Sequence, residues 1–133
     1  MKILIAEDDF VSRKILNTQL TPLGEIDCAA NGNEALTAVK MAFETNQPYD
    51  LICLDIMMPE VDGIMALKKI RQFEAQKGLN PETRSKIIMT TALSDKSHVL
   101  AAAQANCDGF LVKPIIKDRL FDEIRKHGFD IPQ

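Results

Sequence analysis

The chain has 133 residues, 46% of them hydrophobic and 26% charged, which excludes a disordered or fibrous protein and is typical of one folded domain. The 19 acidic residues outnumber the 16 basic ones and give a net charge of -3, so direct binding of nucleic acid is not expected. Nowhere are there the ~18 consecutive apolar residues of a membrane span, so no membrane insertion is expected. We predict a single domain over residues 1–133, with a core at 2–127 and a short C-terminal tail at 128–133.

Cysteine usage points to a reducing compartment. The three cysteines, Cys28, Cys53 and Cys107, are odd in number and form no Cys-x-x-Cys pair. Small secreted scaffolds carry dense, even sets of cysteines. Free thiols and a cytoplasmic location are therefore expected.

Short apolar runs alternate with stretches whose apolar residues recur at helical spacing. Strands are predicted at 3–6, 26–30, 51–54, 86–90 and 109–112, and helices at 10–21, 31–47, 64–73, 94–104 and 117–126. Five strand–helix repeats imply an α/β fold in which a parallel sheet carries helices on both faces. The commonest arrangement of this kind is the doubly wound, flavodoxin-like sheet with strand order 2-1-3-4-5.

Polar side chains follow four of the predicted strands. Glu7 and Asp8 come after the first, Asp55 after the third, Thr91 after the fourth and Lys113 after the fifth. Ligands of an open α/β sheet bind beyond the carboxyl ends of its strands, so we expect these side chains to meet in one crevice. Carboxylates without His or Cys suit Mg²⁺. A cation, a lysine and a hydroxyl around a carboxylate are the groups that phosphoryl transfer uses, and a carboxylate can itself be the nucleophile.

Five segments, in this order, resemble the response-regulator receiver domain of two-component signalling, and the likeness covers residues 2 to about 127. The segments are Ile3–Asp9, Asp50–Pro59, Asp62-Gly63, Thr91-Ala92 and Gly109–Pro114. The resemblance implies a stand-alone, chemotaxis-type receiver, which is a phosphorylation-dependent switch rather than an enzyme. A sensor histidine kinase or a histidine phosphotransfer protein would donate the phosphoryl group from a phosphohistidine.

The resemblance also assigns roles to single residues. Asp55 is implied to be the phosphoacceptor. Mg²⁺ is implied to be held by Asp8 and Asp55 directly, by Glu7 through water, and by the backbone carbonyl of Met57. Lys113 is implied to bind phosphoryl oxygens, with a cis peptide between it and the following proline.

The same resemblance implies how the switch is read. Thr91 is implied to bind phosphoryl oxygens, and Thr91 and Phe110 are implied to rearrange after phosphorylation. Phe110 has no hydroxyl group, so packing alone would drive its movement. The surface formed by strand 109–112 with helices 94–104 and 117–126 would then bind a downstream protein target. Phosphorylation-linked homodimerisation through these helices is left open.

Two apolar residues lie at positions that flank the path of the hydrolytic water in the family. Met57 is two residues past Asp55, and Leu93 is two residues past Thr91. Neither side chain can orient a water molecule and both can exclude one. Self-dephosphorylation is therefore predicted to be slow.

Two other functions fit the sequence less well than the switch. A Mg²⁺-dependent, phosphatase-like hydrolase that forms an aspartyl phosphate at Asp55 would want a second acid two residues further on, where Met57 stands. A mononucleotide-binding flavodoxin-like domain would want a Gly-rich or Ser/Thr-rich phosphate loop after the first strand. That place is taken by Glu7, Asp8 and Asp9, which repel phosphate in the absence of a metal.

Overall fold

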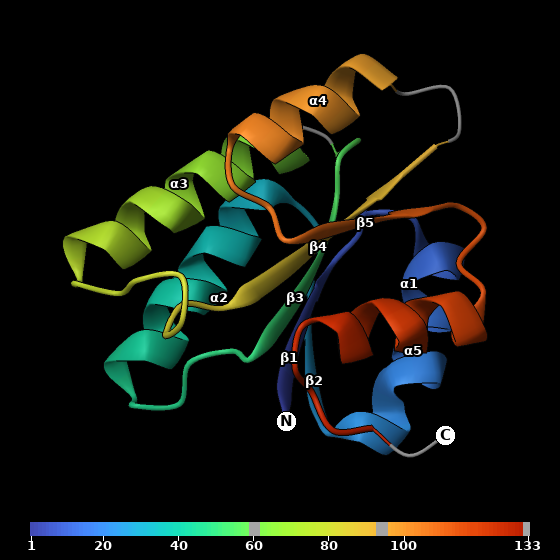
Figure 1. Ribbon diagram of the computed structural model, residues 1–133, viewed down its shortest axis with the longest axis horizontal. Coiled ribbons are helices and arrows are strands. Elements are labelled where there is room, and N and C mark those ends of the chain that lie inside the picture. The colour runs from blue at the N-terminus through green and yellow to red at the C-terminus, as the bar shows by residue number, and fades with distance from the viewer. Residues whose placement is uncertain (59–61, 93–95, 132–133) are drawn as a thin grey trace.

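The computed structural model describes residues 1–58, 62–92 and 96–131. Strands and helices alternate along the chain, as the hydrophobic pattern predicts (Figure 1). The strands are β1 (Lys2–Ala6), β2 (Glu25–Ala29), β3 (Leu51–Asp55), β4 (Lys86–Thr91) and β5 (Gly109–Val112). The helices are α1 (Phe10–Leu20), α2 (Gly32–Glu44), α3 (Gly63–Gln76), α4 (Lys96–Gln104) and α5 (Lys117–Lys126), with a short 3-10 turn, η1 (Thr21–Leu23).

The five strands form one parallel sheet in the order β2-β1-β3-β4-β5, which confirms the predicted doubly wound topology. Ala6 pairs with Leu54 and Asp55 pairs with Thr90, so the carboxyl ends of β1, β3 and β4 lie level with one another. Residues that follow these strands therefore emerge at a common edge of the sheet.

Helices cover both faces of the sheet (Figure 1). Alternate strand residues point to opposite faces and divide the buried side chains into two clusters. One cluster, here the α2–α3 core, contains Leu4 and Ala6 of β1 and is covered by α2 and α3. The other, the α1–α5 core, contains Ile3 and Ile5 and is covered by α1 and α5.

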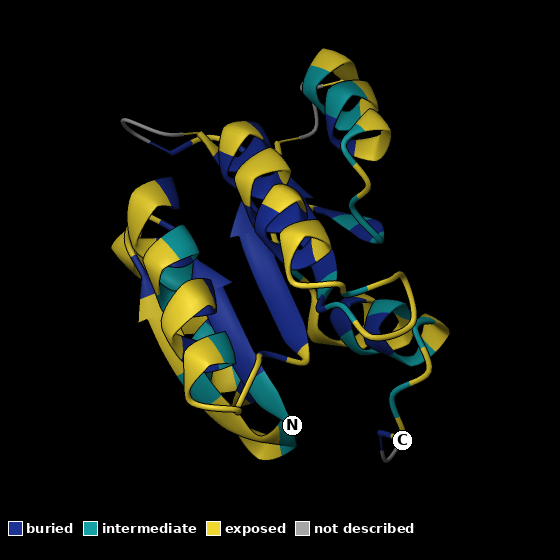
Figure 2. Ribbon diagram, turned by 90° about the vertical axis from the view of Figure 1, so that its left-hand side faces the viewer, coloured by how far each residue is buried: buried dark blue, intermediate teal, exposed yellow. Residues whose placement is uncertain are grey.

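Burial on both faces explains the continuous apolar runs of the central strands. All residues of β3 are buried, whereas the edge strand β2 is largely exposed (Figure 2). In a parallel sheet with two covered faces, central strands lose the polar–apolar alternation of half-exposed strands.

The described part of the chain has no helix that combines the length and the apolar character needed to cross a bilayer.

The structure shifts several predicted boundaries. α1 ends at Leu20, and the chain tightens into η1 at the turn that contains Pro22. α3 begins at Gly63 and continues to Gln76, beyond the predicted range of 64–73, and Gly78 then adopts a φ of 79°. The predicted start of the fourth helix at Ser94 lies outside the described residues.

The predicted C-terminal tail is partly built into the core. Ile131 is buried and Phe129 packs against the α1–α5 core. Residues beyond α5 therefore add apolar contacts to the face of the sheet that α5 covers.

Gly63 holds α3 against the end of β3. Its N–H donates to the carbonyl oxygen of Ile56 at 2.8 Å, and the preceding Asp62 caps the helix by accepting from Met65 N at 2.8 Å. A Cβ atom on Gly63 would overlap the backbone carbonyl oxygen of Asp55. The absence of a side chain thus allows α3 to begin directly beside the last residue of β3.

We expect Gly63→Ala to lower the free energy of unfolding by about 1–3 kcal/mol, because either α3 or the Asp55 backbone must shift. Urea unfolding of the purified protein measures this loss. Met65→Ala is the matched control, since its exposed side chain lies in the same helical turn. Equal stability of Gly63→Ala and the wild type would contradict the tight approach.

Candidate functional site

Four of the polar residues predicted to meet, namely Glu7, Asp8, Asp55 and Lys113, converge at the carboxyl edge of the sheet. Glu7 follows β1, Asp55 ends β3 and Lys113 follows β5. The side chains of Glu7 and Asp55 are buried, whereas Asp8 is exposed. The site therefore combines two buried carboxyl groups with one that faces solvent.

One ammonium group bridges the two buried carboxyl groups. Lys113 Nζ lies 3.0 Å and 3.1 Å from the two carboxylate oxygens of Glu7, and 3.1 Å from Asp55 Oδ2. Charge-assisted hydrogen bonds of this kind are stronger than neutral ones. Since three acids face one lysine, the cluster still has surplus negative charge.

Burial and neighbouring charges shift two pKa values in the site. Burial, with a further contribution from the Asp55 carboxyl group, raises the pKa of Glu7 to about 8, although Lys113 opposes the rise. Burial opposes the charged form of Lys113, but hydrogen bonds to Glu7 and the charge of Asp55 outweigh it and raise the pKa of the lysine. In the absence of a metal, Glu7 is thus held protonated at neutral pH.

Three carboxyl groups of the site could hold a metal ion. One oxygen atom from each of Glu7, Asp8 and Asp55 lies within 4.8 Å of the others. All three are hard oxygen donors, which suits Mg²⁺ better than a soft metal. The exposure of Asp8 leaves room for the water molecules that Mg²⁺ retains. These residues therefore fit the predicted magnesium site.

The third acid of the predicted triplet has a different role. Asp9 is the N-cap of α1, and its side chain accepts a hydrogen bond from Ser12 N at 2.9 Å. This bond lowers the pKa of Asp9. An aspartate directly before a helical pattern is a recognisable N-cap signal, so the sequence could have revealed this role.

The structure also describes the two predicted switch residues and the peptide bond that follows Lys113. Thr91 is buried at the end of β4, and its hydroxyl group donates to the carbonyl oxygen of Ala92 at 3.2 Å. Phe110 is half-buried and packs against the α2–α3 core. The Lys113–Pro114 peptide is cis, as the resemblance implies.

Of the two residues predicted to slow dephosphorylation, the structure describes one. Met57 N donates to Asp55 Oδ1 at 3.3 Å, and the Met57 side chain is 58% exposed. It therefore stands at the rim of the site rather than over a closed cavity. Leu93 lies outside the described residues.

Sequence reasoning missed one contact that supports the site. Arg13 Nη1 of α1 donates to the backbone carbonyl oxygen of Glu7 at 3.0 Å. This bond ties the first turn of α1 to the segment that carries the acids of the candidate metal site. No residue pattern identifies it, because the acceptor is a backbone atom.

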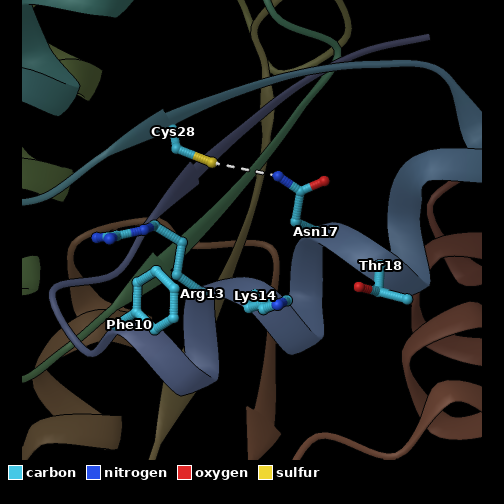
Figure 3. A pocket seen from close by; sticks show the side chains of 6 residues that line it. All are labelled: Phe10, Arg13, Lys14, Asn17, Thr18 and Cys28. Carbon is cyan, nitrogen blue, oxygen red and sulfur yellow. Dashed lines mark hydrogen bonds between the residues drawn. The ribbon is translucent and has the colours of Figure 1, made fainter.

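A hollow of about 350 Å³ is lined by residues of α1 and β2 (Figure 3). It is lined by Phe10, Arg13, Lys14, Asn17, Thr18 and Cys28. Asn17 Nδ2 lies 3.7 Å from Cys28 Sγ across it.

Comparison with known proteins agrees with this geometry. The profile of the response regulator receiver domain matches residues 3–125, nearly the whole chain. The chain belongs to the response-regulator receiver domain family. Receiver domains are the phosphoryl-accepting switches of two-component systems, so this is the functional class of the chain.

Among curated proteins, this receiver domain is 36% identical to the chemotaxis protein CheY of Bacillus subtilis over 125 residues, which cover 94% of this chain and 95% of CheY. It is 34% identical to hybrid signal transduction histidine kinase L of Dictyostelium discoideum over 128 residues, 96% of this chain. The match spans only 7% of that kinase, and 9% of the osmosensing histidine protein kinase SLN1 of Saccharomyces cerevisiae. The receiver fold is thus shared with a small protein and with segments of much larger kinases.

Two solved structures illustrate the shared fold. The CheX–CheY–BeF₃–Mg²⁺ complex of Borrelia burgdorferi is similar with a TM-score of 0.81 and 26% identity, over 98% of this chain and 90% of that one. The receiver domain of the Arabidopsis thaliana histidine kinase CKI1, with Mg²⁺ and BeF₃⁻, has a TM-score of 0.79 and 30% identity. That match covers 95% of this chain and 88% of the CKI1 chain.

Mg²⁺ binding is expected to strengthen as pH rises, because a cation favours the ionised form of Glu7 and its binding must release the proton held below about pH 8. Calorimetric titration with Mg²⁺ between about pH 6 and pH 9 measures this dependence. Affinity should rise towards pH 8 and level off above it. Glu7→Gln should flatten the profile, whereas Asp122→Asn, an exposed control on α5, should keep it. A wild-type affinity that is constant over the whole range would refute the linkage.

Proposed function

We propose that Asp55 accepts a phosphoryl group from a phosphohistidine of a sensor histidine kinase or a histidine phosphotransfer protein, in a Mg²⁺-dependent reaction. The placement of Lys113 Nζ 3.1 Å from Asp55 Oδ2, beside two further acids, carries this proposal. The active unit would be the single domain of residues 1–133, acting in the cytoplasm. Its relatives include histidine kinases and CheY, which supports a kinase as the donor.

The chemistry follows from the groups at the strand tips. A carboxylate oxygen of Asp55 would attack phosphorus, the P–N bond would break, and the imidazole would leave with its electron pair. The ammonium group of Lys113 and the hydroxyl group of Thr91 would then bind the oxygens of the transferred phosphoryl group and stabilise their negative charge. Asp8, Asp55 and the carbonyl oxygen of Met57, with Glu7 acting through water, would hold Mg²⁺, whose charge would offset that of the phosphoryl oxygens.

The response would pass to the opposite face of the sheet. The phosphoryl group adds roughly two negative charges, which would draw Thr91 towards Asp55 and allow Phe110 to repack. Phe110 lies in β5 opposite Met89 of β4, two residues before Thr91, and packs on the α2–α3 core. Leu100 of α4 and Val112 of β5 are exposed apolar side chains on the surface that would change. A downstream protein, or a second phosphorylated copy of the chain, would bind there.

We propose that the chain is a switch that catalyses its own phosphorylation and slow dephosphorylation, without turning over small phosphoesters. A phosphatase that uses an aspartyl nucleophile needs an acid to protonate the leaving group. Met57 occupies the position two residues past Asp55, and its thioether cannot donate a proton. This residue disfavours the phosphatase-like alternative.

Asp55→Asn is expected to abolish phosphoryl uptake, because the amide is a poor nucleophile. Incubation with Mg²⁺ and acetyl phosphate, followed by intact mass spectrometry, measures uptake without a partner protein. The control Asp122→Asn, on the exposed side of α5, should gain the phosphoryl mass like the wild type. If Asp55→Asn gained it equally, the assignment of the phosphoacceptor would be wrong.

Met57→Asn is expected to speed loss of the phosphoryl group by at least about tenfold, because an amide at the rim of the site can orient water and a thioether cannot. The decay of the phosphorylated mass after removal of the donor gives the rate. Met41→Asn, at an exposed position on α2, is the matched control and should decay like the wild type. A wild-type phosphoryl group that is lost within seconds, with Met57→Asn no faster, would contradict this account of slow decay.

A further inference from the structure

Thr90 presents a buried hydroxyl group that the described structure leaves without a hydrogen-bond partner. The residue is 1% exposed, and its Oγ1 atom has no partner among the described residues. Nearly all buried polar groups in proteins are hydrogen-bonded, because an unpaired one loses its bonds to water without replacement. Valine would fill nearly the same volume at this position without that cost. A hydrogen-bond acceptor that Thr90 Oγ1 reaches only in another conformation of the protein would explain why a threonine stands here.

The strand register places Thr90 beside the phosphoacceptor. Asp55 and Thr90 are direct partners in the β3–β4 ladder, and Ile56 N donates to the carbonyl oxygen of Thr90 at 3.1 Å. Partner residues on neighbouring strands lie about 4.8 Å apart and point to the same face of a parallel sheet. The hydroxyl group of Thr90 and the carboxyl group of Asp55 are therefore neighbours.

Strand alternation puts Lys113 on this same face. Asp55, Thr90 and Lys113 each follow, by two positions, a residue of the α1–α5 core, whereas Thr91 follows Met89 of the α2–α3 core. The three preceding residues are Cys53, Ile88 and Leu111. Because β4 lies between β3 and β5, Lys113 must reach across the end of β4 to contact Asp55 at 3.1 Å. The Thr90 side chain thus sits beside the Asp55–Lys113 ion pair.

We propose that Thr90 is a positioning residue whose hydroxyl group donates a hydrogen bond to the Asp55 carboxyl group in the phosphorylated state. The proposal rests on the proposed phosphorylation of Asp55. In the unphosphorylated state Lys113 occupies Asp55 Oδ2. When Lys113 turns to the phosphoryl oxygens, the Asp55 carboxyl group loses this donor, and Thr90 is the neighbouring donor on the same face that the described residues leave unpaired. A bond made in only one of two states shifts the equilibrium towards that state.

Thr90→Val and Thr90→Ser separate a hydrogen bond from simple packing. Titration of the full chain with beryllium fluoride in the presence of Mg²⁺, followed by amide NMR, measures affinity for a phosphoryl mimic. Thr90→Val should bind the mimic about tenfold more weakly, the loss of one hydrogen bond. Thr90→Ser, which keeps the hydroxyl group, should bind within about twofold of the wild type. Without the mimic, the melting temperature of Thr90→Val should rise by about 2–5 °C, because the unpaired hydroxyl group is removed.

The outcomes distinguish this inference from the proposed function. If the wild type failed to bind beryllium fluoride with Mg²⁺, both the assignment of Asp55 as phosphoacceptor and the proposed role of Thr90 would be wrong. Wild-type affinity in Thr90→Val would overturn the role of Thr90 alone. Equal weakening in Thr90→Val and Thr90→Ser would do the same, because it would show that side-chain packing, rather than the hydroxyl group, matters.

Discussion

The ammonium group of Lys113 between Glu7 and Asp55 is the interaction on which the functional account depends. Two carboxyl groups buried side by side would repel if both ionised, and burial already holds the Glu7 proton up to about pH 8. Lys113 reaches both groups, at 3.0 Å and 3.1 Å. The cluster is thus balanced by a mobile side chain that other charges can displace. A divalent cation at the acids and a phosphoryl group on Asp55 would each change the partners of this lysine.

Because alternate strand residues point to opposite faces, the buried acids and the lysine of the site lie on a different face from the residues proposed to rearrange. Glu7, Asp55 and Lys113 continue the α1–α5 face of their strands, whereas Thr91 and Phe110 continue the α2–α3 face. Two consecutive residues of β4, Thr90 and Thr91, therefore lie on opposite faces of the sheet. Thr90 lies beside the ion pair, whereas Thr91 lies on the same face as Phe110, the aromatic residue proposed to move. A change of charge at Asp55 can reach both faces through one strand end, without a long chain of intermediates.

The sequence predicted the topology well because the central strands are buried on both faces and therefore appear as uninterrupted apolar runs. It also predicted that Glu7, Asp55 and Lys113 converge, since their positions follow from strand order. Helix boundaries were less accurate: turn geometry around Pro22 and Gly78 decided where α1 and α3 end. The arginine contact to the Glu7 carbonyl oxygen was out of reach of sequence reasoning, because a backbone acceptor leaves no residue signature. Thr90 was predicted only as a strand residue, although its two-residue spacing from Ile88 already marked the face that it shares with Asp55.

Chemical trapping of the phosphorylated residue tests the central claim most directly. The protein is phosphorylated with Mg²⁺ and a small phosphodonor, the acyl phosphate is reduced with borohydride, and the modified residue is located by peptide mass spectrometry. The account predicts that position 55 alone is converted from aspartate to homoserine. Reduction at Asp8 or Glu7, or no reduced residue in a sample that has gained the phosphoryl mass, would contradict it.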